Sequence, residues 1–113
     1  MNYKLQQKLI ENDNFGKITA SAKRQFEWAL RRNGNSTIMI LVFCSGGKHR
    51  SVAEADGIHY SLSHTPGLSV QAVRHLSRDT WPADLCHLGC DVCNNVREKR
   101  KVLETFRRFW NYC

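Results

Sequence analysis

Eight consecutive residues combine the groups that a protein needs to hold a phosphate. They are Cys44, Ser45, Gly46, Gly47, Lys48, His49, Arg50 and Ser51. The two glycines allow a tight backbone path and leave no side chain between the main chain and a ligand. The Arg50 guanidinium can grip two phosphate oxygens at once, and the neighbouring cations add favourable charge. The pattern predicts an anion-binding loop; the alternative is a tight turn whose basic side chains simply face water.

An anion loop of this kind needs a strand leading into it and a helix leading out. The loop N–H groups then point at the ligand, and the helix amino terminus adds a partial positive charge. Residues 37–43 (TIMILVF) form a continuously apolar run that is rich in β-branched residues, which predicts a strand buried on both faces. Residues 51–63 are predicted to be helical and residues 68–76 to form a second strand. This βαβ order predicts an α/β fold, with a short parallel sheet, flanking helices and the strand–loop–helix unit at its centre.

Three further segments have helical patterns. Residues 1–14 allow a short helix, and residues 18–32 repeat apolar side chains every three or four positions, ending at Asn33-Gly34. Asn95 with Glu98 forms a capping-box pattern at the start of a basic helix. We expect its apolar face to consist of Val96, Leu103, Phe106 and Trp110. Its cations suggest an RNA-binding module, although we favour a packing helix with a solvated basic face, because its apolar side chains need burial.

Composition narrows the class of partner. The chain has 113 residues and a formal net charge of +7, which favours an anionic partner such as a phosphorylated small molecule or RNA. Its longest apolar run, residues 38–44, is too short to span a bilayer, so no membrane contact is expected. The polar amino terminus has no signal-peptide core, which predicts a cytoplasmic protein with reduced cysteines.

A second cluster has some of the spacing of a zinc site. Its members are Cys86, His87, Cys90 and Cys93. Thiolates separated by two residues can share a tetrahedral ion, but a full structural site usually needs two such pairs. We therefore favour reduced thiols in a small subdomain over a metal centre, and predict no cofactor.

The loop FCSGGKHRSV, followed by a helix and then SVQAVRH, resembles the carboxy-terminal domain of the RapZ family of bacterial RNase adapter proteins. The family loop reads CTGGxHRSV, so this chain differs by Ser45 for threonine. The resemblance implies a phosphosugar-sensing domain that binds glucosamine-6-phosphate and contacts RNA and regulatory proteins. By position, all the loop residues listed above except Lys48 would line the phosphate site. Arg74 and His75 look like the family's Arg-His pair beyond the second strand.

The resemblance covers roughly residues 5–79. We place a phosphate-binding domain at residues 1–79, and residues 80–113 would be a Cys-rich segment and a basic helix packed on it. Full-length relatives carry a kinase-like domain with a Walker A loop, which is missing, so nucleotide binding is not implied. Family strands with the motifs FGFKYG and DVRFxxNP are missing too. They would supply the sugar-facing half of the pocket, and their loss exposes a sheet edge, which favours a homodimer.

The same loop also satisfies C-x5-R-S, the signature of cysteine-dependent phosphatases. In that interpretation Cys44 is the nucleophile and Arg50 binds the phosphoryl oxygens. A leaving-group acid would also be needed, and the candidates are Asp13, Asp84 and Asp91. None lies in a convincing acid loop, and Phe43 stands where such enzymes usually place His. We therefore expect non-catalytic binding and keep the phosphatase as an alternative.

Overall fold

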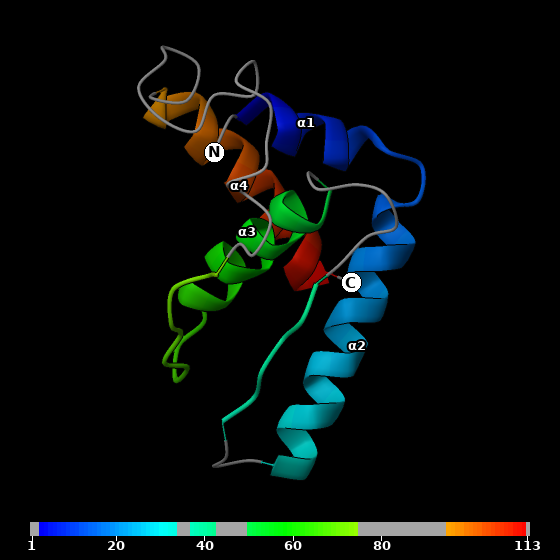
Figure 1. Ribbon diagram of the computed structural model, residues 1–113, viewed down its shortest axis with the longest axis vertical. Helices are drawn as coiled ribbons and strands as arrows, with labels where there is room; N and C mark the ends of the chain where they lie inside the picture. Colours follow the sequence, from blue (N-terminus) through cyan, green and yellow to red (C-terminus); the bar gives the residue numbers. More distant parts are fainter. Residues whose placement is uncertain (1–2, 34–36, 43–49, 75–94, 113) are drawn as a thin grey trace.

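The computed structural model describes residues 3–33, 37–42, 50–74 and 95–112. This part of the chain forms four helices: α1 (Tyr3–Glu11), α2 (Phe15–Asn33), α3 (Arg50–Ser63) and α4 (Val96–Tyr112). The four helical segments expected from apolar spacing are thus all confirmed. Helix α3 lies against α4 and α1, while the far end of the long helix α2 projects away from the other three (Figure 1).

The expectation of an α/β fold with a parallel sheet is wrong. No residue of the described ranges forms a strand, so the predicted βαβ unit is absent there. Residues 37–42 run between α2 and α3, and no other described segment beside them is a strand (Figure 1). Residues 68–74, most of the second predicted strand, are not strand either. β-branched composition favours an extended backbone, but a sheet also requires a second segment placed to accept its hydrogen bonds.

Helices supply the core instead. It is formed by Leu9, Phe15, Val52, Ala53, Ile58, Leu62, Phe106 and Trp110. Phe106 is completely buried, and its ring centroid lies 5.4 Å from that of Phe15 in an edge-to-face contact. Phe26 on α2 approaches Trp110 at 6.3 Å. Aromatic side chains therefore join α2 to α4.

The face that α4 turns to the core differs from the expected one. Val102, Phe106 and Trp110 are buried at four-residue spacing, whereas Val96 is 65% exposed. The prediction is right for Phe106 and Trp110 and wrong for Val96, the first residue of the helix, and for Leu103, which is only half-buried while Val102 takes its place in the core. The predicted cap is confirmed, because the Asn95 side-chain oxygen accepts a hydrogen bond from the Glu98 N–H at 3.2 Å.

A tight turn joins α1 to α2. The Asn12 side-chain oxygen accepts a bond from the Asn14 N–H at 2.9 Å, and the Asn12 carbonyl accepts one from Phe15 at 3.0 Å. These local bonds satisfy backbone groups that neither helix can pair. The turn starts α2 at Phe15, whose ring enters the core.

Candidate anion-binding site

The predicted loop meets the described structure at one end. Arg50 is the first residue of α3, and Ser51 is half-buried in the first turn. Arg74 is exposed beyond α3. The other predicted site residues, Cys44 to His49 and His75, lie outside the described residues. The geometry of the loop and of its Arg-His pair is therefore still a prediction.

The flanking elements are partly those that an anion loop needs. Helix α3 has 14 residues, so its first-turn N–H groups and helix dipole favour a negative charge at Arg50 and Ser51. Residues 37–42 are extended as they run toward this end of α3 (Figure 1). The helix that was predicted to follow the loop is confirmed, whereas residues 37–42, most of the strand predicted to precede it, pair with no other segment of the described ranges.

Glu54 is a buried carboxyl group one turn into α3. Its Oε1 accepts a hydrogen bond from the Thr19 hydroxyl of α2 at 2.7 Å, while its buried Oε2 has no hydrogen-bond partner among the residues that the structure describes. Burial raises the pKa of Glu54, and the Thr19 bond only partly opposes that rise. A raised pKa favours the neutral acid form of this buried side chain.

Sequence reasoning missed this carboxyl group. The available signal was its spacing, because Glu54 precedes the buried Ile58 by four positions and the buried Ser61 by seven. Those intervals place all three on one side of a helix.

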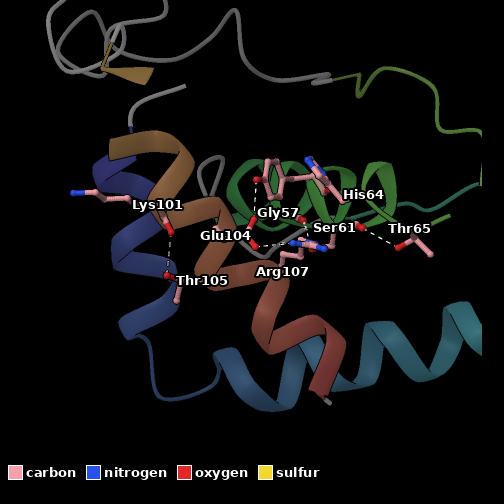
Figure 2. Close-up of polar contacts among 9 residues, drawn as sticks. Gly57, Ser61, His64, Thr65, Lys101, Glu104, Thr105 and Arg107 are labelled. Carbon is pink, nitrogen blue, oxygen red and sulfur yellow. Dashed lines mark hydrogen bonds and ion pairs between the residues drawn. The ribbon is translucent and has the colours of Figure 1, made fainter. Parts of the chain in front are cut away.

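A polar network fastens α3 to α4 (Figure 2). The Tyr60 hydroxyl donates to Glu104 Oε2 at 2.9 Å, and Arg107 pairs with Glu104 Oε1 at 2.6 Å. The Tyr60 hydrogen bond is the main cause that lowers the pKa of Glu104. Desolvation, followed by the bond to Glu104, raises the pKa of Tyr60. His64 lies against the Tyr60 ring, with centroids 4.2 Å apart, so the network extends to the end of α3.

A shallow groove on α4 gathers positive charge. Its lining residues are Val96, Arg97, Arg100, Lys101, Glu104, Thr105 and Arg108. Lys101 is paired with Glu98 at 3.3 Å, whereas Arg97, Arg100 and Arg108 are exposed and form no ion pair within the described part of the chain. Helix α4 therefore has one face that packs in the core and another that forms a solvated basic groove. The first is the packing helix expected from the sequence, and the second is the surface that an RNA-binding module would need.

The remaining predicted chemistry falls mostly outside the described residues. This applies to the metal candidates Cys86, His87, Cys90 and Cys93, and to the acid candidates Asp84 and Asp91. Asp13 is described and lies exposed in the turn between α1 and α2. Within the described ranges, no three His, Cys, Asp or Glu side chains gather closely enough to hold a metal ion. None of the helices in those ranges has the length and apolar character needed to cross a bilayer.

Residues 1–79 match the family described as the RapZ C-terminal domain. The match includes α1, α2, the predicted loop and α3, and it ends before α4. Searches of curated proteins and of solved structures found no match.

Proposed function

Because this chain belongs to the RapZ C-terminal domain family over residues 1–79, we propose that it is a non-catalytic sensor or adapter domain that binds a phosphorylated metabolite where the loop enters α3. One observation carries the proposal: α3 begins at Arg50, directly after the glycine-containing sequence. The helix terminus favours an anion, and the Arg50 guanidinium has the geometry to grip phosphate. We propose a ligand of the glucosamine-6-phosphate type.

Isothermal titration calorimetry tests this assignment. Glucosamine-6-phosphate is titrated into the wild-type chain, with inorganic phosphate and glucosamine as separate ligands. Arg50→Ala removes a charge-assisted contact of about 1.5–3 kcal/mol, so the affinity should fall by about tenfold to a hundredfold. Arg97→Ala removes an equal charge from α4 and is the matched control, since it should leave phosphosugar affinity unchanged.

The outcomes separate the interpretations of the loop. Phosphosugar binding that is lost in Arg50→Ala supports the proposal, while binding of inorganic phosphate alone supports the loop without the sugar pocket. Cys44→Ser should retain binding; phosphate release by the wild-type chain that stops in this variant would instead support the phosphatase alternative. Failure to bind either phosphate compound contradicts the proposed site.

The groove on α4 supports a second candidate function, the binding of RNA. Three exposed arginines, Arg97, Arg100 and Arg108, lie along one helical groove outside the family match. Neutralising phosphates releases counterions, so affinity for a single-stranded RNA oligonucleotide should fall steeply as salt rises. In Arg97→Ala/Arg100→Ala, the slope of log affinity against log salt should shrink by about 1.4, with Arg50→Ala as the control. An unchanged slope in the double variant would exclude this groove as the RNA-binding surface.

A further inference from the structure

Large apolar side chains from two neighbouring elements are exposed together. Within this patch, Met39 and Leu41 are the most exposed, at 81% and 75%, while the two residues on α2 are about half exposed. All of them line one open groove along α2 and residues 37–42 (Figure 1). Contiguous apolar patches on the surface of a small domain mark interaction sites. The apolar patch consists of Ile18 and Trp28 of α2 and of Met39, Ile40 and Leu41 of the extended segment.

Positive charge borders the apolar patch. The cations follow one another, and Trp28, at intervals of three, four or seven residues, which place them on one side of α2. The Arg32 guanidinium lies 4.7 Å from the centroid of the Trp28 ring, so a cation and an aromatic ring are stacked at the edge of the patch. The exposed cations of this border are Lys17, Arg24, Arg31 and Arg32.

Acidic side chains do not offset these cations. Glu27 is the acidic residue of α2, and its carboxylate lies 3.9 Å from the ammonium group of Lys23. Glu54 is the acidic residue among those that line the groove, but it is buried, and burial raises its pKa and favours the neutral acid. This face therefore presents apolar side chains inside a border of positive charge.

That combination fits the surface of an anionic bilayer. Lipid phosphates attract the cations, and apolar side chains beside them can enter the boundary between headgroups and acyl chains. Trp28 suits the interfacial zone, where indole rings are enriched. Lipids are fluid, so Met39 and Leu41 can insert without a pocket that matches their shape. RNA fits less well, because aliphatic side chains provide neither the stacking nor the hydrogen bonds with which proteins hold bases.

We propose that the apolar patch and the cations beside it bind the surface of an anionic membrane, with Met39 and Leu41 inserted below the headgroups and Arg24 and Arg31 on lipid phosphates. Binding to a membrane surface needs no spanning helix. The patch does not include Arg50 at the start of α3, so the proposal is independent of the phosphosugar site.

Co-sedimentation of the nuclease-treated full-length chain with vesicles tests the charge requirement. Vesicles of equal parts phosphatidylglycerol and phosphatidylcholine should bind the wild type, and vesicles of phosphatidylcholine alone should bind it far more weakly. A cation at an anionic surface contributes about fivefold in affinity, so Arg24→Gln/Arg31→Gln should weaken binding about twentyfold to thirtyfold. Lys8→Gln/Lys99→Gln removes the same charge from α1 and α4, outside the patch, and should change the affinity by about twofold at most.

A second variant tests the apolar requirement. Met39→Ser/Leu41→Ser keeps the charge of the chain but removes the side chains that insert, so binding to the anionic vesicles should weaken at least about tenfold. Both side chains are largely exposed, and circular dichroism should show that the helix content is unchanged.

Tryptophan fluorescence reports which face meets the bilayer. Vesicles whose acyl chains carry bromine should quench part of the fluorescence of the wild type. At lipid concentrations that saturate binding, Trp28→Phe should lose that quenched part. Trp110 is buried in the core, so it should be quenched little.

The outcomes decide between a membrane and other partners. Binding that weakens in both patch variants but not in the Lys8/Lys99 control supports the proposal. A wild type that ignores the anionic vesicles overturns it, and so does equal binding by Met39→Ser/Leu41→Ser, which would show adsorption by net charge alone. Quenching that persists in Trp28→Phe also overturns it. Binding of polyglutamate instead of vesicles, lost in Arg24→Gln/Arg31→Gln, would assign the patch to an acidic protein segment.

Discussion

Replacing Gly57 by alanine tests how tightly α3 is seated on α4. A Cβ atom at position 57 would lie 2.5 Å from both Cδ2 and Cε2 of Phe106. Carbon atoms pack best at about 3.5–4.0 Å, so the helices would have to separate by about 1 Å. Phe106 cannot rotate away, because it is completely buried with Phe15 behind it (Gly57 is labelled in Figure 2).

Two effects of Gly57→Ala oppose each other. Alanine in a helix interior is favoured over glycine by about 1 kcal/mol. Overpacking a core usually costs about 1–3 kcal/mol, and the rigid surroundings of Phe106 place this case at the upper end. We therefore expect a net loss of about 1–2 kcal/mol in the free energy of unfolding, or roughly 4–8 °C in melting temperature.

Urea unfolding followed by circular dichroism measures this change. Gly16→Ala is the matched control, because its Cβ would meet Phe109 at an ordinary 3.4 Å. That variant should be neutral or slightly stabilised. The loss caused by Gly57→Ala should shrink in a Phe106→Leu background, where the smaller side chain makes room. If Gly57→Ala is as stable as the wild type, the close approach of α3 and α4 is refuted.

Three other substitutions test the remaining contacts. Burial raises the pKa of Glu54 above its ordinary value of 4.5. The folded protein therefore keeps a proton that the unfolded chain has already released, and the free energy of unfolding falls as pH rises from 4.5 toward the pKa of the folded state. Urea unfolding should show Glu54→Gln to be more stable than the wild type at pH 7, with the advantage disappearing below about pH 4.5; a less stable variant at pH 7 would contradict this reasoning. Tyr60→Phe removes the hydrogen-bond donor that lowers the pKa of Glu104, so it should reduce the free energy of unfolding by about 0.5 kcal/mol at pH 7. The loss should shrink as falling pH protonates Glu104. An acid unfolding curve that is the same in the variant and the wild type would argue against this hydrogen bond. Asn95→Ala should cost about 1 kcal/mol in thermal unfolding, whereas Asn95→Ser should largely restore the cap.

Local patterns in the chain were enough to place its helices. The apolar spacing of α2, the Asn95 cap of α4 and the helical segment after the glycines each depend on neighbours within a few residues. The loop sequence also identified the family, because its motif is contiguous. These patterns depend on residues within one or two helical turns, so they can be recognised without knowing the rest of the fold.

The candidate site could be predicted only in part, because local patterns do not indicate contacts between helices that are far apart in the sequence. Composition and contiguity indicate that Arg50 and the residues before it can hold a phosphate, and α3 begins where that hypothesis requires. Nothing local shows that Glu54 is buried against Thr19, because that contact joins two helices far apart in the sequence. The same is true of Gly57 and Phe106.

Residues 37–42 show where sequence reasoning stops. Their β-branched composition by itself determined an extended backbone. Whether an extended segment becomes part of a sheet depends on a second segment within hydrogen-bonding distance, which composition does not encode. Tertiary structure decided that helices α1, α3 and α4 bury each other's apolar faces and leave Met39 and Leu41 facing outward.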